Sequence, residues 1–286
     1  MTAYTASTER KSPILPRMKL GDLSVSRLIV GTNPFVGKSH LNAALNGEMK
    51  AYFTEEQVHA TLRRCEEEGI TAVQSRGSQP VMGLIDRFRR AGGRLDWIAT
   101  SSKNFITFDE ELAESLKYRP SALCIHGELS DELWMTGNIG KLPGLLEKLR
   151  AAGLPAGICS HFPDVLLWAE EHKLAPDFYM ASVYNLLQPD RSHDVVPTGE
   201  RFERSDVPKM YEAIRAVSAP CIALKILGAG RRCGTQDDVR AAFDEAFASM
   251  KKGDGVLVGM WDKNEEQPAL DARYAAEAIA KAETVR

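Results

Sequence analysis

Short apolar runs alternate with segments of helical periodicity along almost the whole chain. The runs are rich in β-branched side chains and have the length of buried strands, and a helix-like segment follows each of them. We expect strands over 27–32, 71–75, 95–100, 122–126, 156–160, 178–184, 221–227 and 255–260. We expect helices from a capping box at 54–57 onward and over 81–90, 109–117, 163–172, 207–217, 236–251 and 268–282. We also expect a helical connection over 131–152 that is interrupted by Gly137, Gly140 and Pro143.

Eight successive strand–helix units predict an α/β fold, the (β/α)8 TIM barrel, and the length of this chain is typical of that fold. A hairpin over 19–26, turning on Gly21 and Asp22, precedes the first unit. An open doubly wound sheet would need fewer units or a second domain, and no Pro/Gly/Ser-rich linker divides the chain. We therefore expect a flexible tail over 1–16 and a single barrel domain over 17–286.

Polar and ionisable residues stand where several apolar runs end, as at His126, His161 and Lys225. The carboxyl ends of the strands carry the active site in a closed parallel barrel. Because side chains alternate across a strand and small ones suit the crowded interior, we can assign faces. Ile222, Leu224 and Ile226 are placed outside. The residues placed inside are Ala72, Gln74, Arg76, Ala122, Cys124, His126, Gly157, Cys159, His161, Cys221, Ala223 and Lys225.

A polar layer therefore forms at the barrel mouth, where several ionisable groups converge as in a catalytic site. Its members are Gln74, Arg76, His126, His161 and Lys225, with Asn33 at the end of the first strand. We interpret His126, Lys225, His161 and Gln74 as candidate catalytic residues. The alternative is a set of separately hydrogen-bonded polar residues that shape the mouth.

Composition narrows the function classes without choosing among them. The chain of 286 residues has a net charge of -3 and a pI near 6.1, with no basic stripe of the kind that binds nucleic acid. No apolar run reaches membrane-spanning length, and the N-terminus has no signal-peptide core. The five cysteines lack paired spacing, which favours reduced thiols and a cytoplasmic location. The expected partner is a small-molecule substrate, and the oligomeric state stays open.

Several local motifs, taken in order, resemble the aldo-keto reductase superfamily of barrels. They are Val-Ser-Arg-Leu-Ile-Val-Gly-Thr at 25–32, Leu-Cys-Ile-His126, Gly-Ile-Cys-Ser at 157–160, Tyr184-Asn185-Leu-Leu and Val258-Gly-Met260. The resemblance implies an active-site histidine at His126 and a substrate-binding role for Asn185. It also implies reduction of a small carbonyl or sugar-like compound by NADP(H).

The catalytic tetrad of that family is mostly absent. Gln74 stands at the aspartate position, Ser101 at the lysine position, and no tyrosine occurs between Tyr52 and Tyr118. The usual mechanism needs a tyrosine proton donor with a lowered pKa. The resemblance therefore implies a divergent reductase in which His126 is the acid.

A glycine-rich segment follows the seventh predicted strand, where the family binds its cofactor. Gly228 and Gly230 could cradle a phosphate with their backbone amides, and Arg231 and Arg232 could supply charge. A glycine turn with solvated arginines is the alternative.

Three other functions compete with reduction. A lyase, isomerase or hydrolase could use His126 and His161 as acid and base, or hold a divalent metal with His40, Glu128 or Asp262, although no metal-binding motif is present. Lys225 could form an imine with a carbonyl compound, or bind a carboxylate or phosphate. The third alternative is a non-catalytic barrel that kept the fold and lost the chemistry, and its cavity would lack convergent polar groups.

Two long connections are expected over the mouth, at 33–53 and 188–205, where loops often recognise substrate. We interpret Asn33, His40, Arg76, Trp134 and Asn185 as candidate substrate-binding residues. Disordered insertions are the alternative for both loops.

Overall fold

The computed structural model describes residues 15–102, 107–186 and 202–285, which form a closed barrel of eight parallel strands. A two-stranded antiparallel hairpin precedes it, so the predicted fold is confirmed. The hairpin strands are β1 (Arg17–Leu20) and β2 (Leu23–Ser26). The barrel strands are β3 (Leu28–Gly31), β4 (Ala72–Arg76), β5 (Asp96–Thr100), β6 (Ala122–Ile125), β7 (Ala156–Ser160), β8 (Phe178–Ser182), β9 (Cys221–Leu224) and β10 (Gly255–Gly259).

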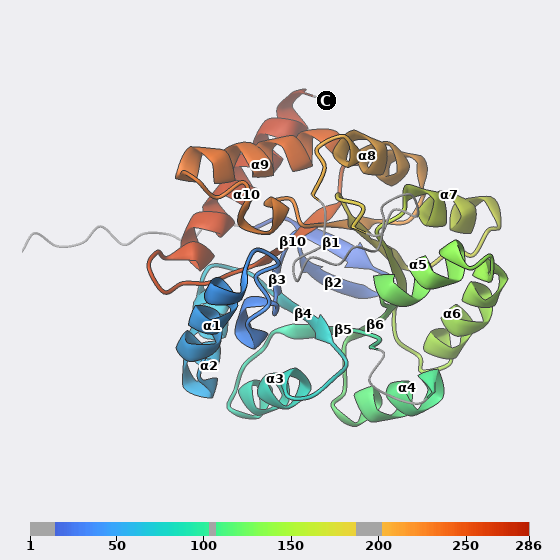
Figure 1. The fold of residues 1–286 in the computed structure, drawn as a ribbon, viewed down its shortest axis with the longest axis horizontal. Helices are drawn as coiled ribbons and strands as arrows, with labels where there is room; N and C mark the ends of the chain where they lie inside the picture. The colour runs from blue at the N-terminus through green and yellow to red at the C-terminus, as the bar shows by residue number, and fades with distance from the viewer. Residues whose placement is uncertain (1–14, 103–106, 187–201, 286) are drawn as a thin grey trace, which may run out of the picture.

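Helices surround the strands on all sides, as seen along the barrel in Figure 1. They are α1 (Ala43–Tyr52), α2 (Glu55–Glu67), α3 (Val81–Arg90), α4 (Phe108–Lys117), α5 (Gly127–Met135), α6 (Leu142–Arg150), α7 (Pro163–Glu171), α8 (Asp206–Ala216), α9 (Gln236–Ser249) and α10 (Gln267–Val285). Short 3-10 turns lie at η1 (Pro34–Val36), η2 (Ile139–Lys141) and η3 (Gly228–Gly230). In the part of the chain that the structure describes, none of these helices has the length and apolarity to cross a membrane.

Two helical regions differ from the sequence prediction. The connection expected as a loop over 33–53 contains α1, whose N-cap Asn42 accepts a hydrogen bond from the Leu45 amide at 2.8 Å. The helical connection over 131–152 begins earlier than expected, at Gly127, and it is divided into α5 and α6 at one of the expected interruptions, Gly137, which has a φ of 70°. Glycine adopts this left-handed conformation readily and so ends α5. Much of the predicted 188–205 loop lies outside the described residues.

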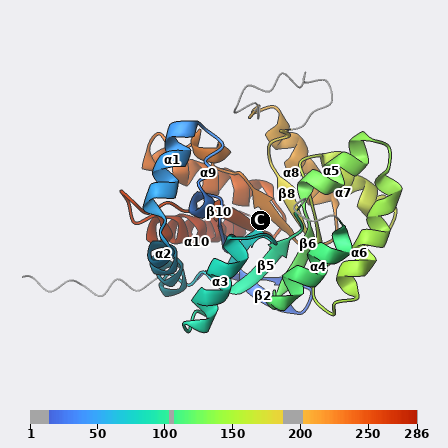
Figure 2. The ribbon, with the colours of Figure 1, turned by 60° about the horizontal axis from the view of Figure 1, so that its bottom comes forward.

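Apolar side chains form two cores, one between the strands and the helices and one inside the barrel. Met18, Leu20 and Val25 of the hairpin belong to the inner core, where they join residues at the amino ends of the strands, such as Ala72 and Phe178. The hairpin therefore closes one end of the barrel. Figure 2 shows β2 at that end, with α1 at the opposite end. Within the described residues, the carboxyl ends of the strands are the open end of the barrel, where a site can form.

The predicted inward faces are right for β4, β6 and β7 but wrong for β9. Met180 of β8 faces inward and pairs in register with Ile222, and residues paired across neighbouring strands share a face. Ile222 and Leu224 therefore face inward, whereas Cys221 and Ala223 pack under the helices. The interior is filled by large side chains at this level, so small size was a poor guide to the face.

Candidate active site

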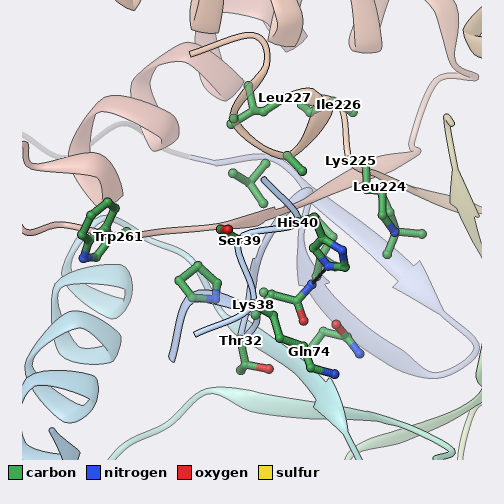
Figure 3. A pocket seen from close by; sticks show the side chains of 18 of the residues that line it. Thr32, Lys38, Ser39, His40, Gln74, Leu224, Lys225, Ile226, Leu227 and Trp261 are labelled. Atoms are coloured by element: carbon green, nitrogen blue, oxygen red, sulfur yellow. Dashed lines mark hydrogen bonds between the residues drawn. The ribbon is translucent and has the colours of Figure 1, made fainter. Parts of the chain in front are cut away.

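A cavity of about 500 Å³ opens at the carboxyl ends of the barrel strands. Gln74, Arg76, His126, His161 and Lys225, which come from four different strand ends, all line it. Figure 3 shows Gln74, His40 and Lys225 around this space. A cavity of this size accommodates a small organic ligand, and convergent polar groups at a barrel mouth are typical of an active site.

Lys225 reaches the cavity through an unusual backbone conformation. β9 ends at Leu224, and continued alternation from the inward Leu224 would direct Lys225 outward. Lys225 instead has a φ of 63°, a conformation that is uncommon for a residue other than glycine. This turn at the strand end places Lys225 on the wall of the cavity.

A chain of hydrogen bonds joins Lys225 to a buried carboxylate. Lys225 Nζ lies 3.3 Å from His161 Nε2, and His161 Nδ1 lies 2.6 Å from Asp131 Oδ2. Asp131 is fully buried on α5, and its Oδ1 accepts from Ser160 Oγ at 2.5 Å and from the His161 amide at 3.1 Å. With Nδ1–H donating to Asp131, the imidazole presents the lone pair of Nε2 to Lys225.

His126 is held as a neutral imidazole. Its Nδ1 accepts from the Glu128 amide at 3.1 Å, so the ring caps the N-terminus of α5 and carries its proton on Nε2. Burial, reinforced by the Arg76 guanidinium, lowers the pKa of His126 to about 3. His126 can therefore donate a hydrogen bond from Nε2 but does not bear positive charge near neutral pH.

An ion pair between Arg76 and Glu128 lies beside His126. Arg76 Nη1 donates to Glu128 Oε2 at 3.3 Å, and a shorter bond joins Arg76 Nη2 to Glu128 Oε1. Partial burial raises the pKa of Glu128, but the Arg76 hydrogen bond, the neighbouring His126 ring and the charges of Arg76 and Lys38 together outweigh it and lower the pKa. Gln74 Nε2 donates to Thr100 Oγ1 at 3.3 Å. These contacts fix the polar side chains of the wall.

The connection after β3 borders the same cavity. Asn33 Nδ2 lies 3.0 Å from His40 Nε2, and the His40 carbonyl accepts from Arg231 Nη1 at 3.1 Å. Asn33, Lys38 and His40 all line the cavity. The predicted position of Asn33 and His40 over the mouth therefore matches the structure, and their roles in binding substrate stay predictions.

Trp134 and Asn185 lie away from the main cavity. They line a second cavity of about 380 Å³, together with Asp206 and Lys209 of α8. His161 lines both cavities, so its imidazole forms part of the wall between them. A substrate in the main cavity would not contact Trp134 and Asn185 without passing this wall.

The two arginines of the glycine-rich segment are engaged in contacts within the protein. The Arg231 guanidinium lies 3.9 Å from the centre of the Phe202 ring, and Arg232 forms a short ion pair with Glu245. Gly228 and Gly230 have φ values of 56° and 88°, as a tight turn requires. Binding of a nicotinamide phosphate here stays a prediction, and both arginines would have to leave these partners to serve it.

Among the residues that the structure describes, no group of three or more His, Cys, Asp and Glu side chains could hold a metal ion. Asp262, one of the ligands considered from the sequence, accepts from Arg64 Nε at 2.9 Å and from Thr61 Oγ1 at 2.9 Å on α2. It is therefore engaged on the helical side of the barrel.

Asp131 is the important residue that the sequence did not indicate. The predicted helix began at Asp131, and an aspartate at a helix start is explained as a cap. The helix begins earlier, at Gly127, which places Asp131 in its second turn and against β7. In the sequence Asp131 is one of three acidic residues over 128–132, so no local pattern distinguished it. Lys38 and Asp271, which also line the cavity, carried no distinguishing pattern.

No protein-family model and no curated protein matches the chain. Solved structures share its fold. A truncated 3-deoxy-D-arabino-heptulosonate 7-phosphate synthase from Thermotoga maritima has a TM-score of 0.52 at 12% identity, with 95% of this chain and 92% of that chain covered. 3-Hexulose-6-phosphate synthase from Salmonella typhimurium has a TM-score of 0.51 at 11% identity, with 89% and 99% covered. The Amycolatopsis orientalis BexX/CysO complex has a TM-score of 0.52 at 15% identity, with 96% and 97% covered.

The resemblance to aldo-keto reductases is wrong, because these structurally similar barrels belong to other families. The motifs that suggested it are apolar strands followed by a polar residue, as in Leu-Cys-Ile-His126. A closed parallel barrel with a polar mouth needs such segments whatever reaction it catalyses. Identities this low establish the fold alone, so the reaction has to be argued from the cavity.

Proposed function

We propose that the chain is an enzyme of the lyase or isomerase type in which the Lys225 amine forms an imine with a small carbonyl compound. The observation that carries this proposal is the hydrogen-bonded chain from Asp131 through His161 to Lys225 at the barrel mouth. An amine must lose its proton before it can act as a nucleophile, and a positioned base does this. His161 Nε2 is such a base at 3.3 Å.

The proton movements follow from the geometry. His161 Nε2 accepts a proton from the Lys225 ammonium, and Asp131 stabilises the imidazolium through Nδ1–H. The Lys225 amine then attacks the substrate carbonyl carbon and gives a carbinolamine. His161 returns its proton to the departing hydroxyl group, so one water leaves and a protonated imine remains. This cation accepts the electron pair of a breaking C–C or C–H bond in the substrate.

His126 and the cations of the wall have supporting roles in this scheme. The neutral His126 ring can donate from Nε2 to a substrate carbonyl or hydroxyl oxygen, and its lowered pKa prevents it from competing with Lys225 as a second cation. Lys38 and Arg76 line the same wall and suit an anionic substituent. Two structurally similar barrels are named as synthases of phosphorylated sugars, which is compatible with a small polar carbonyl substrate.

Reductive trapping tests the proposal directly. The protein is incubated at pH 7.5 with glyoxylate or propionaldehyde and sodium cyanoborohydride, and the modified lysines are identified by peptide mass spectrometry. We expect Lys225 to be modified faster than the exposed Lys19 by about 10²-fold, the lower end of the contribution of a positioned base. Asp131→Asn should remove most of this advantage because it no longer accepts the His161 proton.

Lys38→Ala is the matched control, because it removes a different lysine from the same cavity. With propionaldehyde, which has no anionic group for Lys38 to bind, it should leave the labelling rate of Lys225 within a few-fold of the parent. Equal labelling of Lys225 and Lys19 would refute imine chemistry and leave Lys225 as a residue that binds anions. A Lys225 rate that is insensitive to Asp131→Asn would remove the role of the hydrogen-bonded chain.

A further inference from the structure

The main cavity has a second part, away from the strand ends, between the first turns of α9 and α10. Residues of both helices and of the preceding loops line it: Gln236, Val239, Trp261, Glu265, Leu270 and Asp271. In Figure 3, Trp261 lies on the opposite side of the cavity from Lys225. A small carbonyl compound bound at Lys225 would leave this part unfilled, and its side chains are available to bind another portion of a ligand.

Asp271 is a buried acid that has no hydrogen-bond or ion-pair partner among the described residues. It is 4% exposed and lines the cavity. Across residues 15–102, 107–186 and 202–285, no hydrogen bond or ion pair reaches its carboxyl group. Burial and the nearby charge of Glu265 raise the pKa of Asp271 to about 8. A buried carboxyl group without hydrogen-bond partners is energetically unfavourable unless a bound ligand supplies those partners.

The surroundings of Asp271 indicate the charge of that ligand. Glu265 also lines this part of the cavity, and its Oε2 accepts from Gln236 Nε2 at 2.7 Å. Among the described residues, the lysine and arginine side chains that line the cavity are Lys38, Arg76 and Lys225, all near the strand ends. The part near Asp271 thus combines two carboxyl groups with the apolar side chains of Val239 and Leu270.

We propose that Asp271 and Glu265 bind the ammonium group of a ligand whose apolar portion lies between α9 and α10. A cation satisfies a buried carboxylate, whereas a neutral hydroxyl would leave its charge unpaired. The site is separate from the chemistry of Lys225 and exists whether or not an imine forms. If both proposals hold, the substrate is a carbonyl compound that also carries an amine.

Calorimetric titration at pH 7.5 with n-butylammonium chloride as the probe tests this site, and 1-butanol is the uncharged comparison. We expect butylammonium to bind more tightly than butanol. Asp271→Asn should weaken its binding by roughly tenfold to a hundredfold, the range for a charge-assisted hydrogen bond. Asp244→Asn, an equal charge change on the exposed side of α9, should have no comparable effect. Lys225→Ala should bind butylammonium at least as tightly as the parent.

Thermal unfolding of the same variants at pH 9 gives a second measurement that does not require a ligand. Asp271→Asn removes an unpaired buried charge without changing its shape, so its Tm should rise. A lower Tm would mean that Asp271 has a stabilising partner within the protein and would overturn the premise. Equal affinity for butylammonium and butanol, or for the parent and Asp271→Asn, would overturn the site itself.

Discussion

His126 has a structural role in the fold and a chemical role in the proposed function. Its Nδ1 accepts a hydrogen bond from the Glu128 amide at the start of α5, and His126 also lines the cavity. The cap determines which nitrogen carries the proton, and burial keeps the ring neutral. The chemistry available to this residue is therefore set by its position at the helix terminus.

The titration of His126 can be measured by 15N NMR of the imidazole nitrogens. The pKa of His126 is about 3 in the folded protein and 6.5 for an unperturbed ring. We expect neutral-ring shifts with the proton on Nε2 from pH 8 down to pH 5. Because the unfolded chain binds a proton here below about 6.5 and the folded protein does not, this group lowers the stability as the pH falls from 6.5 towards 3. A ring that titrates near 6.5 would contradict this account.

At the scale of elements, the prediction for β9 placed Lys225 at the cavity correctly but assigned the wrong inward face to the strand. Alternation with small residues inside predicted that Lys225 lies in the barrel, and Lys225 does line the cavity. The register with β8 instead sets Ile222 and Leu224 inside, and a left-handed turn after Leu224 brings Lys225 in. Sequence periodicity cannot reveal such a turn, because lysine has no preference for positive φ.

The apolar runs and the helix starts were easier to predict, because their signals are local. β7 and α3 have the predicted bounds, and Thr54 caps α2 as expected by accepting from the Gln57 amide. Asp131 was missed because its role depends on a contact between α5 and β7 that no local pattern records. The second cavity around Trp134 likewise depends on how α5, α7 and α8 lie beside the barrel.

The cap on α5 allows stability and activity to be separated at His126. His126→Ala removes the N-cap acceptor and should lower the free energy of unfolding by about 1 kcal/mol, whereas His126→Asn retains a capping oxygen and should cost much less. Urea unfolding of both variants measures this difference. Both should be similarly impaired in the reaction if the ring donates to substrate. Equal stability of the two variants would show that the cap contributes little.

At the scale of the whole molecule, stability and chemistry occupy opposite ends of the barrel. The hairpin packs Leu20 into the inner core at the amino ends of the strands, and the cavity opens at their carboxyl ends. Barrels in general divide stability and function in this way. We therefore expect changes in the hairpin to affect folding and to leave the cavity intact.

Leu20→Ala tests this division. Leu20 is fully buried, so its truncation should lower the free energy of unfolding by roughly 2–5 kcal/mol in chemical denaturation. The labelling rate of Lys225 in the absence of denaturant should not change. Leu41→Ala, at a residue that is 37% exposed, is the comparison and should be nearly neutral for stability. A change in Lys225 labelling with Leu20→Ala would mean that the two ends are coupled.

His161 lies between the main cavity and the second cavity beside α8. Ser182 at the end of β8 also lines both cavities, so these two residues form part of the shared wall. A substitution of His161 therefore changes the wall of the cavity that contains Lys225 and the wall of the cavity beside α8. In the proposed function, the base that activates the Lys225 amine is thus also one of the residues that separate the two cavities.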